Sequence, residues 1–331
     1  MTSVVLGIGT AVPDKILTNL ELESMVDTTD EWILSRTGIE ERRIADPAQA
    51  TSDLALSASK LALERAGISA DELDLILVAT VTPDMIFPAT ACILQEALGA
   101  VNAGAFDLSA GCSGFIYALT IADQFLRGGK CRYVLIAAAE TLSRITNYED
   151  RNTCILFGDG AGAAVLGQGS KPYGIISTYI GADGSGESLL HVPAGGSRLP
   201  ASQETIGKDL HYIHMQGNEV FKFAVSIIPD CITRVLKESG MAIENVDHFV
   251  FHQANRRILK TAVKRMNLPW EKLIVNLEKY GNISAASIPL ALGEAVEDGR
   301  VKEGDLVMMV AFGAGLTMGA ALVRWGEARN D

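Results

Sequence analysis

The chain has 331 residues, 48% of them hydrophobic, and is therefore long enough to bury one large core or two fused ones. Its formal net charge of -12 disfavours nonspecific binding to nucleic acid. We find no apolar stretch long enough to cross a bilayer and no basic segment at the start that is typical of a signal peptide. We therefore expect a cytoplasmic protein that binds neither nucleic acid nor membrane.

The cysteines of the chain form no CxxC pair, and they make no Cys/His cluster with metal-ligand spacing. This pattern argues against a zinc site and against a disulfide framework. We expect most of the cysteines to be reduced core residues. They are Cys92, Cys112, Cys131, Cys154 and Cys231.

An internal repeat predicts the architecture. Residues 63–78 match residues 236–251 without a gap, and each segment reads as a helix end, a glycine C-cap, a short loop and a buried strand. Further on, the apolar strand 132–140 corresponds to 305–313, and the glycine-rich segment 158–167 corresponds to 313–324. The sequence therefore predicts two similar α/β halves, residues 1–170 and 171–331, with a pocket between them.

Cys112 is the candidate nucleophile of the first half. It follows the apolar, strand-like residues 105–108 and precedes a helical pattern, with Gly111 and Gly114 close by. These glycines permit a sharp turn and a close approach by a substrate. At a helix N-terminus the unpaired backbone N–H groups should lower the pKa of the thiol and favour the thiolate. The alternative is a buried structural cysteine.

Two residues of the second half occupy similar strand-to-helix junctions. His252 ends an apolar strand and precedes a basic helix, whereas Asn282 follows a glycine and precedes small residues and another helix. Taken singly, His252 could be a core histidine and Asn282 a turn or helix cap. Together with Cys112 they form a Cys-His-Asn set that suits covalent catalysis by a thiol.

The glycine runs at 7–9 and 158–162 resemble fragments of a dinucleotide-binding fingerprint, but neither is complete. We interpret them as close packing between strands of a duplicated sheet. By the same reasoning the Gly313 segment could place a backbone N–H donor near the thiol.

The helix after His252 carries a basic stripe in an otherwise acidic chain, made of Arg256, Arg257, Lys260, Lys264 and Arg265. It could be an ordinary solvated helix face. Its position directly after a candidate catalytic histidine favours the docking of an acidic partner instead.

Six motifs in this order carry a family resemblance over essentially the whole chain. They are DEWILSRTGI at 30–39, SAGCSG at 109–114, FGDGAG at 157–162, HQAN at 252–255, GNISAA at 281–286 and FGAGLT at 312–317. The sequence resembles the thiolase superfamily of decarboxylating condensing enzymes, and most closely the β-ketoacyl-acyl carrier protein synthase III family. The resemblance implies a duplicated thiolase-like fold, a five-layered αβαβα sandwich that forms a homodimer.

The resemblance also implies a reaction. Cys112 takes an acyl group from acyl-CoA, with the oxyanion held by the backbone N–H groups of Cys112 and Gly313. Malonyl-acyl carrier protein then loses carbon dioxide, and His252 and Asn282 stabilise the enolate that attacks the acyl-enzyme. No metal and no organic cofactor is implied, since CoA arrives as part of the substrate. The reaction would initiate fatty acid biosynthesis.

Other site residues follow from the same resemblance. Trp32 and Arg151 would stack on the CoA adenine, and Arg36 would contact a phosphate. The pantetheine tunnel would be lined by Asn255, Met215 and Gly217, and the acyl pocket by Phe87, Leu142 and Phe157. The partner at the basic stripe would be acyl carrier protein.

Three alternatives stay open at this point. A thiol hydrolase could use the same Cys-His-Asn residues with water as the acceptor. A noncatalytic nucleotide-binding protein would use the glycine runs and would not need Cys112. Within the family, a condensing enzyme that makes a starter unit for secondary metabolism is the alternative, and the identity of the primer depends on pocket volume.

Overall fold

The computed structural model describes residues 2–326. Its first sheet has five strands in the order β1-β7-β6-β4-β5. β4 is parallel to β5 and to β6, whereas β7 is antiparallel to β6 and β1. The strands are β1 (Thr2–Ala11), β4 (Leu75–Ala79), β5 (Gly104–Leu108), β6 (Tyr133–Thr141) and β7 (Asp159–Gly169).

The second sheet has four strands in the order β11-β12-β13-β8. They are β8 (Gly174–Ala182), β11 (His248–Phe251), β12 (Leu306–Gly313) and β13 (Thr317–Arg324). β11, β12 and β13 occupy the places that β4, β6 and β7 have in the first sheet, as the repeat predicts. The strands change sheet between Gly169 and Gly174, which is where the sequence places the boundary between the halves.

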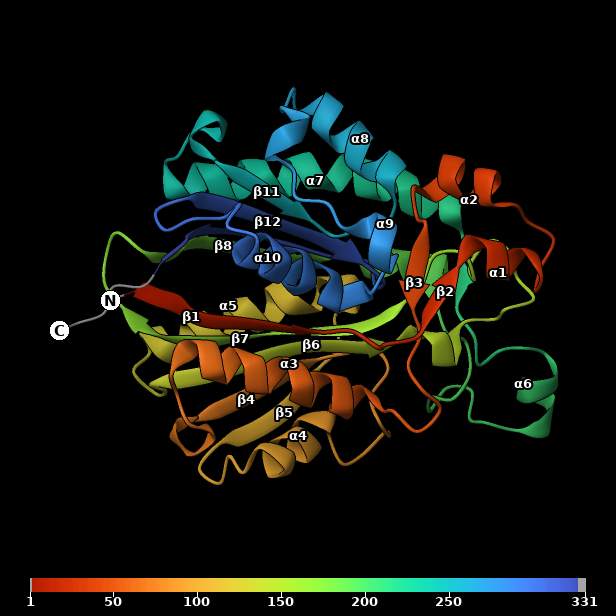
Figure 1. The fold of residues 1–331 in the computed structure, drawn as a ribbon, viewed down its shortest axis with the longest axis horizontal. Coiled ribbons are helices and arrows are strands. Elements are labelled where there is room, and N and C mark those ends of the chain that lie inside the picture. The colour runs from red at the N-terminus through yellow and green to blue at the C-terminus, as the bar shows by residue number, and fades with distance from the viewer. Residues whose placement is uncertain (1, 327–331) are drawn as a thin grey trace.

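Helices cover both sheets and fill the space between them (Figure 1). α3 (Thr51–Ala66) and α4 (Thr90–Leu98) pack on the first sheet, and α7 (Gly217–Ser239) packs on the second beneath α8 (Arg256–Arg265). Between the sheets lie α5 (Gly114–Arg127) and α10 (Ser287–Glu297). The molecule is therefore the five-layered αβαβα sandwich that the sequence predicts.

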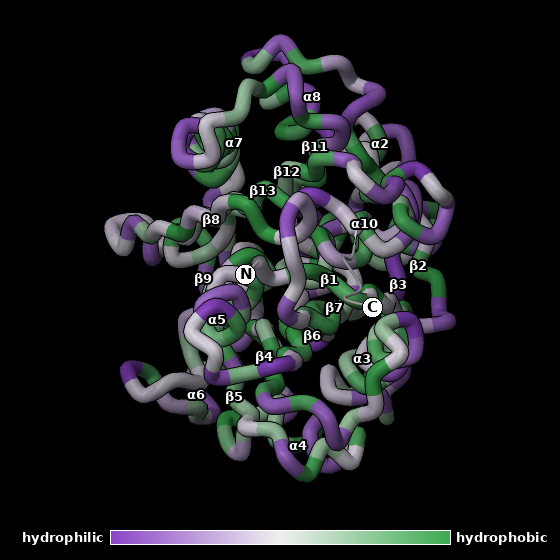
Figure 2. The backbone as a smooth tube through the Cα atoms, turned by 90° about the vertical axis from the view of Figure 1, so that its left-hand side faces the viewer, coloured by the Kyte–Doolittle hydropathy of each residue, from purple (hydrophilic) through white to green (hydrophobic). Residues whose placement is uncertain are grey.

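The interior strands are mostly apolar, as the hydropathy colouring of the backbone shows (Figure 2). β4 and β12 are buried along their whole length, because helices cover both faces of each sheet. No helix within residues 2–326 has both the length and the hydrophobicity that a membrane span requires.

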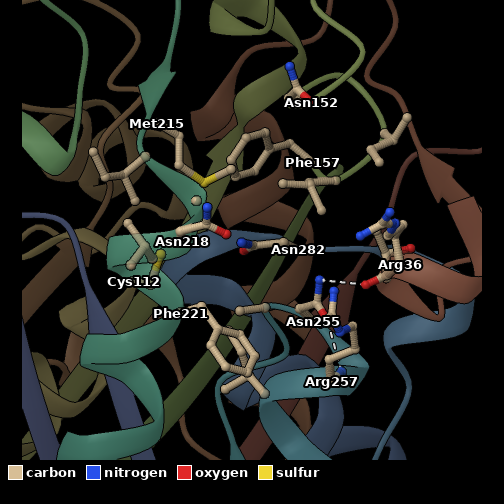
Figure 3. A pocket seen from close by; sticks show the side chains of 18 of the residues that line it. Arg36, Cys112, Asn152, Phe157, Met215, Asn218, Phe221, Asn255, Arg257 and Asn282 are labelled. Atoms are coloured by element: carbon tan, nitrogen blue, oxygen red, sulfur yellow. Dashed lines mark hydrogen bonds between the residues drawn. The ribbon is translucent and has the colours of Figure 1, made fainter.

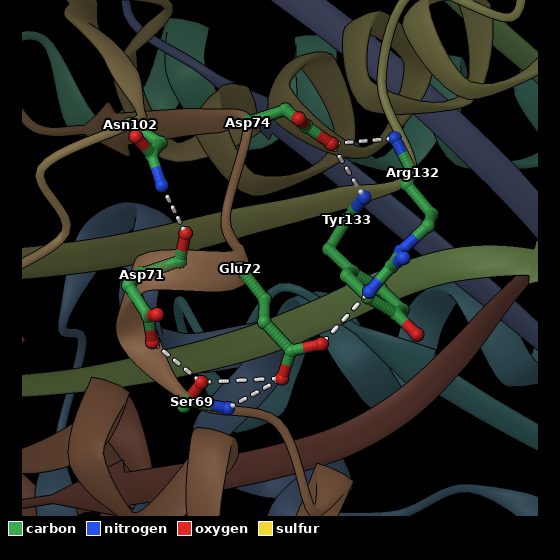
Figure 4. A network of polar contacts seen from close by, with 7 residues as sticks. All are labelled: Ser69, Asp71, Glu72, Asp74, Asn102, Arg132 and Tyr133. Atoms are coloured by element: carbon green, nitrogen blue, oxygen red, sulfur yellow. Dashed lines mark hydrogen bonds and ion pairs between the residues drawn. The ribbon is translucent and has the colours of Figure 1, made fainter.

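The matching segments of the repeat form the same local structure twice. Gly67 is the C-cap of α3, and Gly240 is the C-cap of α7. Both glycines have a left-handed φ, 66° and 68° respectively. A short 3-10 turn then leads into β4 or β11. In the first copy the Asp74 carboxylate accepts the backbone N–H groups of Arg132 and Tyr133 at 2.6 and 3.1 Å, which ties β4 to the start of β6 (Figure 4).

The halves are not independent units, because part of the first half packs on the second. This part contains β2 (Ile16–Thr18), α1 (Asn19–Glu23), α2 (Asp30–Thr37) and β3 (Glu41–Arg43). Leu17, Leu22 and Ile33 share one hydrophobic core with α7 and α8. The remaining short elements are β9 (Leu190–His191), α6 (Gln203–Gly207), β10 (His214–Met215) and α9 (Leu277–Tyr280).

Candidate active site

Cys112 lies in a one-turn 3-10 helix, Gly111–Ser113, between β5 and α5. The Gly313 backbone at the end of β12 packs directly against it, so that a Cβ atom at Gly313 would lie 2.4 Å from the Cys112 backbone nitrogen. Gly111 has a φ of +53°, and a Cβ atom there would lie 2.8 Å from the Ala314 nitrogen. The two halves therefore meet backbone to backbone at the thiol, and only glycine fits at these contacts.

The Cys112 thiol is buried, with 8% of the residue exposed. Burial raises its pKa to about 12, and the nearby Glu140 carboxylate adds to the increase. The expectation of a lowered pKa was therefore wrong, because desolvation of the thiolate outweighs the hydrogen bonds from Ser284 and from the Cys112 backbone, which lower the pKa. This pKa favours the neutral thiol near pH 7, so a nucleophilic role would require a proton acceptor.

His252 directly follows β11 and is 1% exposed. Its backbone N–H donates to the Val310 carbonyl at 2.8 Å, and its ring meets the Phe312 ring edge-on with centroids 5.2 Å apart. Ring atom Nδ1 lies 2.7 Å from the Ser287 hydroxyl oxygen. Burial lowers the pKa of His252 to about 3, so the imidazole is neutral near pH 7.

Asn282 is fixed by backbone contacts on both sides. Its N–H donates to the Leu156 carbonyl at 2.8 Å, and its carbonyl accepts the Gly158 N–H at 3.1 Å. The side-chain oxygen Oδ1 accepts the Ser284 N–H at 2.8 Å. Because Oδ1 is held in this way, the side-chain NH₂ group is left as the donor for a ligand.

These side chains come together at one cavity of about 600 Å3 (Figure 3). Cys112 and His252 lie on its wall with Asn282, so the structure unites residues from both halves. Other residues that the sequence predicts also line this cavity: Trp32, Arg36, Phe157, Met215, Gly217, Asn255, Arg257 and Gly313. Asn218 and Phe221 line it too but carry no motif that could have revealed them.

Two guanidinium groups lie close to the Trp32 ring, which is part of this wall. The central guanidinium carbons of Arg151 and Arg36 lie 5.1 and 5.7 Å from the centre of its ring. Arg151 itself does not line the cavity and also forms a 3.6 Å ion pair with Asp27. An aromatic face with two cations beside it suits a base attached to phosphates.

A second, mainly apolar cavity of about 220 Å3 also reaches Cys112. Leu142 and Phe157 line it, as the sequence predicts. The sequence does not point to the other apolar residues of this cavity, because they come from short loops and strands without a periodic pattern. They are Val81, Ile145, Leu190, Val192 and Ile213.

The structure places Phe87 away from the other residues that the sequence assigns to an acyl pocket. Phe87 lines neither cavity that contains Cys112, and the residue is 82% exposed. It lies three residues before α4, which packs on the edge strand β5. Within one chain, Phe87 therefore does not reach the cavities at Cys112.

The basic stripe forms the single helix α8. Asn255 is its N-cap and accepts the Arg257 N–H at 2.8 Å, while its NH₂ group donates to the Arg36 carbonyl at 3.1 Å. Arg256 pairs with Glu278 at 3.3 Å, and Arg265 donates to the Val225 carbonyl at 2.8 Å. The exposed members of the stripe are Arg257, Lys260, Lys264 and Arg265. Within residues 2–326 no group of His, Cys, Asp and Glu could hold a metal ion.

Two family models match the chain. Residues 106–184 match "3-Oxoacyl-[acyl-carrier-protein (ACP)] synthase III", and residues 236–325 match the model of its C-terminal part. These ranges contain Cys112, His252 and Asn282.

Individual relatives cover almost the whole chain. A β-ketoacyl-[acyl-carrier-protein] synthase III from Caldanaerobacter subterraneus subsp. tengcongensis is 58% identical, with 98% of each chain covered. The crystal structure of 3-oxoacyl-[acyl-carrier-protein] synthase III from Aquifex aeolicus VF5 is 47% identical, with a TM-score of 0.91 over 98% of this chain and 100% of that chain.

A further solved structure is the priming β-ketosynthase of the R1128 polyketide pathway, which is 37% identical, with a TM-score of 0.90 over 99% of this chain and 97% of that chain. The curated relative is thus more similar than this polyketide enzyme, and the likeness includes both halves and the loops that carry the cysteine, histidine and asparagine. The chain therefore belongs to the 3-oxoacyl-[acyl-carrier-protein] synthase III family.

Proposed function

We propose that the chain catalyses the decarboxylative condensation of a short acyl-CoA with malonyl-acyl carrier protein, and so initiates fatty acid biosynthesis. The observation that carries this proposal is the position of Cys112. Its thiol meets a larger cavity lined by Trp32 and Arg36 and a smaller apolar cavity lined by Leu142. An acyl-CoA could place its CoA part in the larger cavity and its acyl chain in the smaller apolar cavity. Its thioester carbonyl carbon would then lie next to the Cys112 sulfur.

The first half-reaction forms an acyl-enzyme. The Cys112 sulfur bonds to the thioester carbon, and the oxyanion receives hydrogen bonds from the backbone N–H groups of Cys112 and Gly313. The carbon–sulfur bond to CoA then breaks. Trp32 and Arg151 would stack on the adenine, with Arg36 on a phosphate. Met215, Gly217 and Asn255 would flank the pantetheine arm.

The second half-reaction makes the new carbon–carbon bond. Loss of carbon dioxide from the malonyl group leaves an enolate, whose oxygen would accept hydrogen bonds from His252 and the Asn282 NH₂ group. The carbanion carbon attacks the acyl group and expels the Cys112 sulfur, which gives a 3-oxoacyl thioester. The thioester and the leaving carboxylate already activate this carbon, so the proposed chemistry uses no metal and no organic cofactor.

The exposed lysines and arginines of α8 would receive the acidic carrier protein beside the mouth of the cavity.

We further propose a cytoplasmic homodimer. Its interface would contain β5, which ends the first sheet without a further strand among the described residues. Large apolar side chains are exposed near this edge: Met85, Ile86, Phe87 and Phe106.

The test of the function is acyl transfer to a defined thiol. After incubation with acetyl-CoA, intact-mass and peptide analysis should place one acetyl group on Cys112 in the wild type and in C92A, which removes the exposed Cys92 thiol. C112A should carry none. An adduct that survives in C112A would overturn the proposal, and release of acetate by water without a malonyl donor would favour a hydrolase.

A further inference from the structure

Ser287 is a buried residue at the start of α10 whose hydroxyl contacts the ring of His252. It lies outside the Cys-His-Asn set, and it does not line either cavity at Cys112. Its hydroxyl oxygen has polar neighbours on three sides. These neighbours are the Ser284 carbonyl at 2.9 Å, the Gln253 backbone N–H at 3.4 Å and Nδ1 of His252 at 2.7 Å.

Two of these neighbours have fixed roles, and with both of their bonds made they set the role of the third. The Ser284 carbonyl accepts the backbone N–H of Ser287 and also its hydroxyl, and this second bond uses the one hydrogen of the hydroxyl. The Gln253 N–H can only donate, so it uses an acceptor site of the hydroxyl oxygen. The short contact with Nδ1 is then satisfied only when Nδ1 carries a hydrogen and donates it to Ser287.

We infer that Ser287 holds His252 in the tautomer with its hydrogen on Nδ1, so that Nε2 faces the cavity as a proton acceptor for Cys112. A neutral imidazole carries one ring hydrogen, so a hydrogen on Nδ1 leaves a lone pair on Nε2. The lowered pKa of His252 supports the neutral form. Ser287 is in this view a positioning residue that acts through His252.

The inference rests on the proposed function for its use in catalysis, and the protons balance in each step. In the first half-reaction Nε2 takes the hydrogen of the Cys112 thiol as the sulfur attacks acyl-CoA. The departing CoA sulfur then takes this hydrogen from Nε2, which releases CoA as a thiol and returns His252 to the same neutral tautomer.

In the second half-reaction the anionic malonyl group offsets the burial penalty of an imidazolium, so Nε2 takes up one proton from solvent as this substrate binds. Nε2–H then donates to the enolate oxygen. When the new carbon–carbon bond expels the Cys112 sulfur, that sulfur takes the proton from Nε2. The solvent proton is the one that the overall reaction consumes, and the bond from Nδ1 to Ser287 persists throughout.

The tautomer can be measured directly by 15N NMR of the full-length enzyme labelled at histidine, with H252Q used to identify the His252 signals. We expect the wild type near pH 7 to show a hydrogen on Nδ1 and an unprotonated Nε2. A wild-type spectrum with the hydrogen on Nε2 would overturn the inference without any variant, and it would leave the proposed acylation of Cys112 intact.

The variant S287A tests the role in catalysis. We expect a share of His252 to change to the Nε2–H tautomer, and the single-turnover rate of acetyl transfer to Cys112 to fall on the order of 10-fold, with the apparent affinity for acetyl-CoA unchanged. The matched control is S59A, which removes a fully buried hydroxyl in α3 that has no hydrogen-bond partner among the described residues. S59A should behave as the wild type, and an S287A protein with the wild-type tautomer and acylation rate would contradict the inference.

Discussion

At the scale of single residues, replacing Asn282 should slow the second half-reaction and leave the first nearly unchanged. Its backbone bonds to Leu156 and Gly158 do not involve the side chain, so N282A should keep the wall of the cavity in place. The variant lacks the NH₂ donor proposed for the enolate, and it also lacks the Oδ1 acceptor of the Ser284 N–H. We expect decarboxylation of malonyl-CoA to fall about 10²–10³-fold, because this is the usual effect of removing one donor to an oxyanion.

Acyl transfer to Cys112 should change little in N282A, since the oxyanion of that step is assigned to backbone N–H groups. The two rates can be measured separately by acetyl labelling and by release of carbon dioxide. Equal losses in both would mean that Asn282 holds the site together rather than serving the enolate.

The sequence pointed to the proposed catalytic residues, which the structure brings to one cavity, but not to their protonation. Cys112, His252 and Asn282 are recognisable because each stands at a strand end beside glycine or small residues. The pKa of Cys112 was not predictable in this way, since it depends on how completely the second half covers the thiol. A helix end contributes roughly 0.3–1 kcal/mol at an exposed site, which is less than the cost of burying a thiolate.

At the scale of elements, a change in α8 should affect the proposed reaction with malonyl-acyl carrier protein more than the reaction with malonyl-CoA. Lys260 and Lys264 are exposed, one turn apart, and neither lines the cavity at Cys112. In the double variant K260E/K264E, the KM for malonyl-acyl carrier protein should rise roughly tenfold, because exposed charges act mainly on encounter and orientation. The kcat/KM for malonyl-CoA should stay near the wild-type value.

The control for this variant is K60E, which makes a single replacement of the same kind at the exposed Lys60 of α3, on the first half. It should leave both reactions unchanged. Added salt should weaken the reaction of the wild type with the carrier protein more than that of the double variant. A loss with both malonyl donors would indicate damage to α8, and no loss with either would identify the stripe as a solvated surface.

Elements with a strong local signal were predictable, and elements without one were not. The repeated helix, glycine and strand segments were recognisable because Gly67 and Gly240 end long helices before buried strands. β9 and β10, by contrast, pair with each other over only two residues each, and their loops supply the apolar wall around Leu190 and Ile213. Two residues cannot show a period, so this part of the site depends on tertiary packing.

At the scale of the whole molecule, the two similar α/β halves followed from the repeat and the five-layered sandwich from the family resemblance, but the position of residues 14–43 followed from neither. This segment belongs to the first half in sequence and to the second half in packing, because its apolar residues complete the core under α7 and α8. A sequence repeat does not show that a segment of one half packs on the other half.

The proposed homodimer leads to a prediction at the same scale. Ile86 and Phe87 are 86% and 82% exposed near the edge strand β5, and a second copy would cover them. The variant I86D/F87D should reduce the mass measured by light scattering from twice the 35.2 kDa of the chain toward that of one chain.

The control is L20D, which introduces one aspartate at an apolar residue of α1 that is 69% exposed. It should leave the mass unchanged. A wild type that already has the mass of one chain would refute the homodimer, and an unchanged mass in I86D/F87D would move the interface elsewhere.

The raised pKa of Cys112 also affects how readily its thiol is oxidised. Peroxides and glutathione disulfide react with thiolates, and a buried thiol with a pKa near 12 presents almost none of that form. In the proposed mechanism Cys112 would become strongly nucleophilic only while a substrate and His252 are in place. Between turnovers the neutral, buried thiol would resist the irreversible oxidation that a thiolate undergoes.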